Sequence, residues 1–208
     1  MSILKTIKKN KIIPLGTLVN EDEVLNICNC LTEADIPLIE VTLRDKRVID
    51  AIPSFKKYPN IYLGIGTIRT PEQVDLAINA GASFAITPGF SPKISDYASS
   101  KGLVLIPGVQ TASEVMAASE AGHKVLKFFP AELSGGIDKL NAFKSVFPDI
   151  TFIPTGGITN KNIANYLNLD NVVAIGASSA MPESLIRSKS WDQITNNLLE
   201  IKTIIETT

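Results

Sequence analysis

Lys127 lies in the middle of an apolar run, residues 125–129, that has the length and composition of a buried strand. Burial disfavours an ammonium ion and favours the neutral amine. A neutral lysine amine is a nucleophile that condenses with a ketone or aldehyde to form a Schiff base. The alternative is a structural lysine that extends to water from a strand end or pairs with a core carboxylate. This segment alone does not distinguish the two interpretations.

Strand alternation brings further reactive side chains toward the same place. In residues 38–44, Glu40 shares one strand face with Thr42 and Arg44. The same alternation places Thr67 on one face with Leu63 and Ile65, and Thr155 on one face with Ile153. We therefore expect a carboxylate, a guanidinium, two hydroxyls and the amine of Lys127 to converge on one site.

Each of these groups suits one step of Schiff-base chemistry. Lys127 would attack a substrate ketone, and Glu40 would transfer protons as a general acid and base. The Arg44 guanidinium would bind a carboxylate with paired hydrogen bonds, and Thr67 would bond the same carboxylate. A carboxylate close to Lys127 would favour the ammonium and oppose the effect of burial. The alternative for Glu40 and Arg44 is a structural ion pair at a strand end.

Small residues follow the last two expected strands, as Thr155-Gly156-Gly157 and Gly176-Ala177-Ser178. Such residues let backbone N–H groups approach an anion closely, and barrel enzymes often bind phosphate at the loops after their last two strands. We therefore predict a phosphate site formed by Gly156, Gly157, Ala177 and Ser178. The alternative is a pair of ordinary glycine turns.

Short apolar runs alternate with amphipathic segments along the whole chain. The eight expected strands are residues 12–15, 38–43, 61–65, 84–86, 103–106, 125–129, 151–154 and 172–175. Eight strands alternating with helices predict an α/β fold of the (β/α)8 TIM-barrel class, because the polar residues follow many strands. An open doubly wound sheet would bind its ligand at one switch point instead.

Helix signals complete the prediction of a single barrel domain over residues 1–208. Asn20 with Glu23 and Thr111 with Glu114 have the spacing of a capping box, and Pro71 follows Thr70 as a first helical residue would. Apolar spacing predicts an N-terminal helix near residues 1–9 and a final helix from about residue 190 to 206.

Composition excludes several other classes of function. The 208 residues carry a net charge of -1, so there is no basic surface for nucleic acid. No apolar run has the length to span a membrane, and the start lacks the pattern of a signal peptide, so we expect a cytoplasmic protein. Cys28, Cys30 and the single histidine His123 do not form a metal pattern, so we expect no metal and no cofactor.

Six blocks in this order resemble the 2-keto-3-deoxy-6-phosphogluconate (KDPG) aldolase / 4-hydroxy-2-oxoglutarate aldolase family. The blocks are Leu38-Ile39-Glu40-Val41-Thr42-Leu43-Arg44, Gly64-Ile65-Gly66-Thr67, Phe84-Ala85-Ile86-Thr87-Pro88-Gly89, Ile106-Pro107-Gly108-Val109, Lys127-Phe128-Phe129-Pro130-Ala131-Glu132 and Pro154-Thr155-Gly156-Gly157-Ile158. The resemblance implies a metal-independent class I aldolase on a (β/α)8 barrel, assembled as a homotrimer. It implies the same roles for Lys127, Glu40, Arg44 and Thr67.

The resemblance also adds Phe129 and Pro88 to Thr155 as residues of the substrate pocket. It implies cleavage of KDPG or a related 4-hydroxy-2-keto acid to pyruvate and an aldehyde, either glyceraldehyde 3-phosphate or glyoxylate. Where that family often has Gly-Gly-Ser-Trp, this chain has Gly176-Ala177-Ser178-Ser179, and Gly16 stands where a larger apolar residue is usual. The alternatives are a non-catalytic metabolite-binding barrel and an aldolase for an unphosphorylated or epimeric keto acid.

Overall fold

The computed structural model describes residues 2–208, in which parallel strands alternate with helices. The strands are β1 (Ile12–Gly16), β2 (Leu38–Thr42), β3 (Tyr62–Gly66), β4 (Phe84–Ile86), β5 (Val104–Ile106), β6 (Gly108–Val109), β7 (Val125–Phe128), β8 (Thr151–Pro154) and β9 (Ile175–Ala177). The α-helices are α1 (Ile3–Asn10), α2 (Glu21–Glu33), α3 (Val48–Ala51), α4 (Pro71–Asn79), α5 (Pro92–Ser100), α6 (Ala112–Glu120), α7 (Gly136–Val146), α8 (Ile163–Leu167), α9 (Glu183–Arg187) and α10 (Trp191–Glu206). Short 3₁₀ segments occupy Ile52–Lys57, Glu132–Ser134 and Ser178–Ala180.

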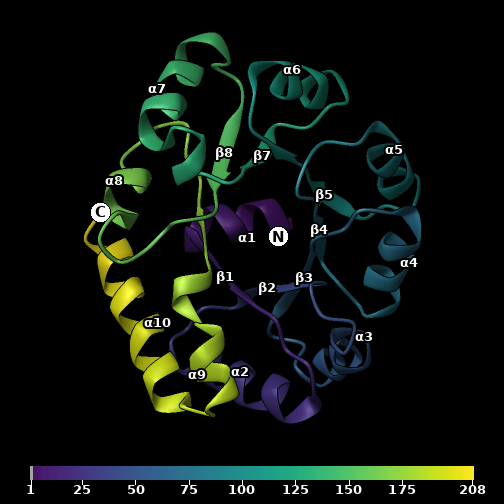
Figure 1. The fold of residues 1–208 in the computed structure, drawn as a ribbon, viewed down its shortest axis with the longest axis vertical. Coiled ribbons are helices and arrows are strands. Elements are labelled where there is room, and N and C mark those ends of the chain that lie inside the picture. Colours follow the sequence, from purple (N-terminus) through teal and green to yellow (C-terminus); the bar gives the residue numbers. More distant parts are fainter. Residues whose placement is uncertain (1) are drawn as a thin grey trace.

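The strands form a curled parallel sheet with helices on its outer side (Figure 1). One set has the order β5-β4-β3-β2-β1-β9 and the other β6-β7-β8. A bridge between Thr155 and Gly176 joins β8 to β9. On the other side, the Lys127 N–H donates to the Pro107 carbonyl at 2.9 Å, which links β7 to the junction of β5 and β6. The α/β class and the order of its elements are confirmed.

Two of the expected strands differ from the prediction. The run at residues 103–106 continues past Pro107 as β6, and the ladder is interrupted there because proline has no N–H to donate. The run at 172–175 pairs with β8 only through Val172, and β9 begins at Ile175, where the chain turns to pair with β1. Because this segment changes its pairing partner from β8 to β1, only Ile175–Ala177 form a regular strand.

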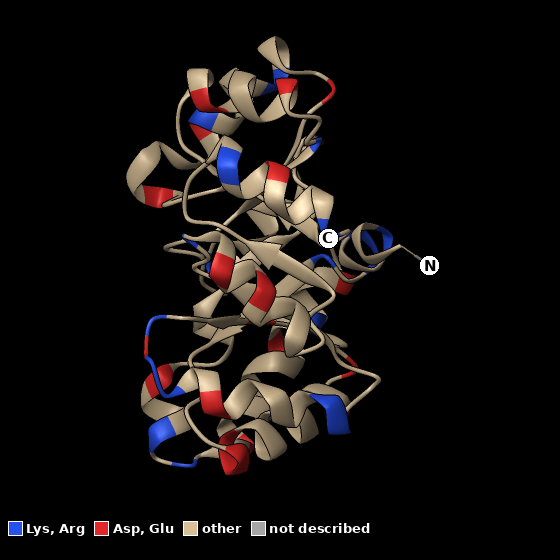
Figure 2. Cartoon of the chain, turned by 90° about the vertical axis from the view of Figure 1, so that its right-hand side faces the viewer, with Lys and Arg blue, Asp and Glu red and all other residues tan. Residues whose placement is uncertain are grey.

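Buried apolar side chains form two groups. The larger lies between the strands and the surrounding helices, and it includes Ile39 and Leu126. The smaller lies on the inner side of the sheet, where Ile13, Leu38 and Ile153 pack with Ile7 of α1. The N-terminal helix therefore covers the N-terminal ends of the strands, and the side view of Figure 2 shows it at one edge of the molecule.

The expected helix starts are present, with one change in detail. Thr111 and Glu114 form a complete capping box. The Asn20 side chain accepts from the Glu23 N–H at 2.9 Å, but Glu23 returns its bond to the N–H of Val19 rather than of Asn20. Within the described part of the chain, no helix is both long enough and apolar enough to cross a membrane.

Candidate active site

Lys127 and Glu40 meet inside the curled sheet, although 87 positions separate them in the chain. The Lys127 Nζ lies 3.1 Å from Glu40 Oε1 and 3.4 Å from Oε2. The exposed fractions are 5% for Lys127 and 1% for Glu40. Burial of an ion pair gives little net stability, because removing two charges from water offsets their attraction. A pair kept at this cost is a candidate for chemistry.

Alternation in β2 and β7 explains why these two side chains face each other. Ile39 and Val41 on β2, and Leu126 and Phe128 on β7, belong to the group packed against the helices. Glu40 and Lys127 therefore point to the inner side. The Phe129 ring follows on β7's inner side, with its centroid 5.3 Å from the Lys127 Nζ.

Gly66 provides the space that the Glu40 carboxylate occupies. A Cβ at this position would lie 2.0 Å from Glu40 Oε1, closer than any real contact. Gly66 is not among the residues that the sequence predicts for the site. The available signal was the alternation of Gly64 and Gly66 in one strand, since glycine in a strand interior often marks a close approach.

Thr67 has an unusual backbone conformation. Its φ is +66°, in the left-handed region, which is costly for a β-branched residue by about 1–3 kcal/mol. Leu63 and Ile65, which share its parity, pack against the helices. Alternation alone would therefore send Thr67 outward, and the left-handed turn is what ends that alternation. Such strain is concentrated at functional sites, which supports the role predicted for Thr67.

A cavity of about 470 Å³ opens at the C-terminal ends of the strands. Of the predicted site residues, its lining includes Arg44, Phe129, Thr155, Gly156, Gly157 and Ser178. Lys127 and Glu40 are not among its lining residues; they lie in β7 and β2, which end just before Phe129 and Arg44. Thr67, Pro88 and Ala177 do not line this cavity, and Ala177 is buried at the end of β9.

The two loops at the late strands are fitted closely to one another. Gly156 and Gly157 have φ values of +100° and +80°, which strongly favour glycine. A Cβ at Gly176 would lie 2.2 Å from Thr155 Oγ1, so this glycine makes room for the threonine. The Ser179 hydroxyl donates to the Ile158 carbonyl at 2.8 Å and links the two loops.

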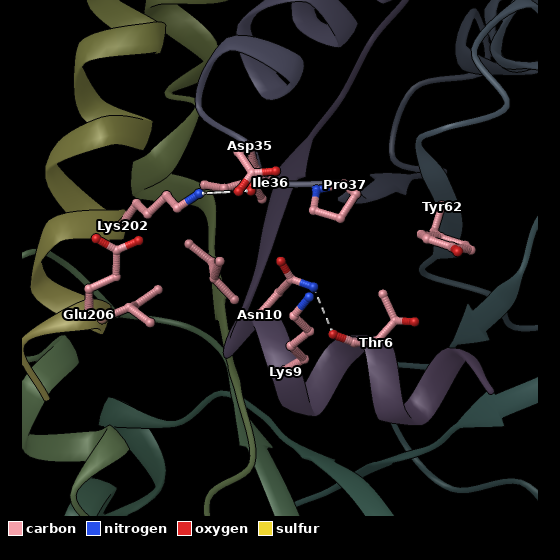
Figure 3. Close-up of a pocket in the computed structure, with 11 residues that line it drawn as sticks. Thr6, Lys9, Asn10, Asp35, Ile36, Pro37, Tyr62, Lys202 and Glu206 are labelled. Atoms are coloured by element: carbon pink, nitrogen blue, oxygen red, sulfur yellow. Dashed lines mark hydrogen bonds and ion pairs between the residues drawn. The ribbon is translucent and has the colours of Figure 1, made fainter. Parts of the chain in front are cut away.

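A second cavity, of about 410 Å³, lies near α1 and α10 (Figure 3). Lys202 and Asp35 form an ion pair of 2.5 Å across one side of it, and Tyr62 stands on the other. Neither residue of this ion pair is buried. The 470 Å³ cavity is lined by Arg44 and Phe129, which follow directly on the strands that carry Glu40 and Lys127, so we take it as the candidate active site.

The cysteines and the histidine lie apart from the candidate site. Burial raises the pKa of the Cys28 thiol to about 12, so it is a poor nucleophile. His123 follows α6 and its Nε2 lies 2.7 Å from the Ser95 hydroxyl. Among residues 2–208 there is no group of three or more His, Cys, Asp or Glu side chains placed to hold a metal ion.

Comparison with known proteins identifies the family of the chain. The model of the family described as KDPG and KHG aldolase matches residues 3–197. The chain belongs to this aldolase family. A 2-dehydro-3-deoxy-phosphogluconate aldolase of Haemophilus influenzae is 35% identical over 205 residues, covering 98% of this chain and 97% of that protein.

Two further aldolases give the same relationship. The KHG/KDPG aldolase of Escherichia coli K12 is 35% identical, over 93% of this chain and 90% of its own. A crystal structure of the Legionella pneumophila KDPG aldolase matches with a TM-score of 0.91 and 35% identity, over 96% of this chain and 97% of that one. That structure holds pyruvate as a covalent carbinolamine intermediate.

Proposed function

We propose that this aldolase-family chain is a class I aldolase that reversibly cleaves KDPG or a related 4-hydroxy-2-keto acid. The products are pyruvate and an aldehyde, glyceraldehyde 3-phosphate or glyoxylate. The observation that carries the proposal is the buried Lys127–Glu40 pair, with 3.1 Å between amine and carboxylate. The Legionella pneumophila relative, with its covalent carbinolamine of pyruvate, supports a Schiff-base route.

The pair is sufficient for the proton transfers of such a route. Glu40 takes a proton from the ammonium, and the neutral Lys127 amine adds to the C2 ketone to give a carbinolamine. Glu40 returns this proton to the carbinolamine hydroxyl, which leaves as water and gives the iminium. Glu40 then accepts the C4 hydroxyl proton, the C3–C4 bond breaks, and its electrons move into the iminium to form an enamine. The aldehyde leaves, the enamine is protonated at C3, and water releases pyruvate.

The strand ends would hold the rest of the substrate. We assign the keto-acid carboxylate to Arg44 and Thr67, with Phe129, Pro88 and Thr155 around the carbon chain. We assign a phosphate to Gly156, Gly157, Ala177 and Ser178. The positive φ values at Gly156 and Gly157 support the phosphate assignment, because such backbone turns N–H groups toward an anion.

We further propose a closed (β/α)8 barrel that forms one domain over residues 1–208 and assembles as a homotrimer, with no metal and no cofactor. The links at Thr155–Gly176 and Lys127–Pro107 support closure of the sheet on both sides. Light scattering after size exclusion tests the trimer; a monomer across the micromolar range would contradict it.

Trapping with pyruvate and borohydride tests the chemistry. Reduction of the Schiff base should leave a pyruvyl adduct on Lys127, found by peptide mass spectrometry. Lys127→Gln should form no adduct and should lose aldol cleavage by at least about 1,000-fold, because the covalent route is closed. The matched control is Lys124→Gln, which removes an exposed lysine paired with Asp149 on the same segment.

Two outcomes would contradict the assignment. Substantial cleavage by a folded Lys127→Gln variant would remove the lysine from the mechanism. No adduct at saturating pyruvate would favour a metabolite-binding protein without turnover. A panel of phosphorylated and unphosphorylated 2-keto acids, including epimers at C4, then identifies the preferred substrate.

A further inference from the structure

Two threonine hydroxyls meet in the wall of the active-site cavity, and the mechanism above gives them no role. Thr17 follows β1 and Thr42 ends β2, and their Oγ1 atoms lie 2.8 Å apart. Both residues line the 470 Å³ cavity. Thr42 is only 3% exposed, so bulk water has little access to it.

The pair keeps unused hydrogen-bonding capacity. Two hydroxyls have two hydrogens, and the bond between them uses one. Among residues 2–208, neither hydroxyl makes another hydrogen bond in addition to this one. One donor and several lone pairs therefore remain for a third polar group. A hydroxyl on a ligand, which both donates and accepts, matches this arrangement.

The position of the pair selects one part of the substrate. Thr42 lies two residues beyond Glu40 on the same face of β2, which places it roughly 7 Å further along the strand. Strand β1 lies between β2 and β9. A substrate whose carbon chain extends from Arg44 on the β2 side to Ser178 after β9 therefore passes Thr17.

The backbone of Thr17 is also fixed by a side chain from α9. The Arg187 guanidinium donates to the Thr17 carbonyl at 3.1 Å. The same guanidinium pairs with Glu23 at 2.6 Å. A hydroxyl on a braced backbone loses little freedom when it binds a ligand, so it can discriminate between similar ligands.

We infer that Thr17 and Thr42 recognise a hydroxyl on the carbon next to the cleaved bond, that is, the C5 hydroxyl of the substrate. The inference rests on the proposed aldolase function, in which Glu40 serves the C4 hydroxyl. This contact with the two threonines makes the enzyme selective for aldehydes that carry a hydroxyl on the carbon next to the carbonyl. In the condensation direction, that aldehyde carbon becomes C5 of the product.

The test compares two aldehydes that differ by this hydroxyl alone. Condensation of pyruvate with D-glyceraldehyde 3-phosphate is compared with condensation with 3-phosphooxypropanal, as kcat/KM for the aldehyde at saturating pyruvate. Thr17→Val and Thr42→Val keep the shape of the side chain and remove its hydroxyl. Each should lower the preference for the hydroxylated aldehyde by about tenfold. Thr42→Ser should keep most of the preference.

Control measurements separate recognition from structure. Thr151→Val makes the same change at the other end of a strand, where the hydroxyl bonds the Lys124 carbonyl, and should leave the preference unchanged. If the valine variants keep the wild-type preference, or lose activity equally on both aldehydes, the inference is wrong and the pair only joins β1 to β2. The pyruvate–borohydride adduct distinguishes this failure from that of the proposed function. An adduct with unchanged preference overturns only the threonine assignment, whereas no adduct in the wild type overturns the function.

Discussion

At the scale of single residues, the site depends on Gly66 as much as on the groups that react. A methyl group at this position would overlap the Glu40 carboxylate, 2.0 Å from Oε1. Glu40 would have to turn away from Lys127, and proton transfer depends on their distance. The glycine is therefore a positioning residue for the carboxylate that we propose as the general base.

Gly66→Ala should lower kcat about 100-fold, within the range attributed to general acid–base catalysis. The pH–rate profile should change shape with it, because the displaced carboxylate has a new environment. Gly89→Ala is the control, since a Cβ there would meet nothing within 4 Å. A Gly66→Ala enzyme with wild-type kcat and pH profile would show that Glu40 is not held by this contact.

His123 links stability to pH at a place remote from the site. Burial lowers the pKa of this half-buried imidazole, which contacts the Ser95 hydroxyl. An unfolded histidine has a pKa of about 6.5, so between that value and the lower folded pKa the unfolded chain binds more protons. The contribution of His123 to the free energy of unfolding is therefore fully present above about pH 7, and it is lost as the pH falls through this window.

Urea unfolding at pH 8 and pH 5.5 measures this effect. His123 is the only histidine in the chain, so His123→Gln removes the whole contribution. The difference in unfolding free energy between the two pH values should be smaller in the variant than in the wild type. An equal difference in both proteins would place the pH dependence elsewhere.

At the scale of elements, the two late loops act as one unit. The Ser179 hydroxyl bonds the Ile158 carbonyl, so the loop after β9 is tied to the loop after β8. Where the resemblance described above implies a tryptophan, this chain has a small hydroxyl, which joins the two loops through a hydrogen bond.

Ser179→Ala should raise KM for a phosphorylated keto acid several-fold. The loops after β8 and β9 would bind the phosphate together, and the variant removes the hydrogen bond that joins them, which is worth about 1 kcal/mol. The KM for an unphosphorylated keto acid should change much less. Ser188→Ala removes another serine hydroxyl, which bonds the Leu185 carbonyl, and serves as the control. An equal rise in KM on both substrates would contradict a phosphate site at these loops.

The elements were largely predictable from sequence because their signals are local. Apolar runs located the strands, and the Thr111–Glu114 capping box located the start of α6. Pro107 was visible in the sequence, but the interruption that it causes depends on which strand lies alongside. The left-handed turn at Thr67 could not be predicted, because threonine rarely adopts it and only the surrounding packing enforces it.

At the scale of the whole molecule, the pairing of Lys127 with Glu40 depends on the register of strands far apart in sequence. Alternation gave each side chain a face, but the 3.1 Å contact needs the arrangement of all the strands between β2 and β7. The arrangement was predicted from the resemblance to the aldolase family rather than from the pattern of any one strand. The space at Gly66 and the hydroxyl pair at Thr17 and Thr42 arise only from the packed structure.

Helix α1 has a consequence for the order of events in catalysis. Ile3 and Ile7 pack into the apolar group at the N-terminal ends of the strands, whereas the cavity taken as the candidate active site opens at their C-terminal ends. The amine of Lys127 lies deeper than the loops assigned to phosphate. A molecule bound at those loops would obstruct the path to the amine. We therefore expect the aldehyde to depart before pyruvate in cleavage, and pyruvate to bind first in synthesis. Product-inhibition kinetics would show pyruvate competitive with the keto acid and the aldehyde noncompetitive; the reversed pattern would mean a second route to the lysine.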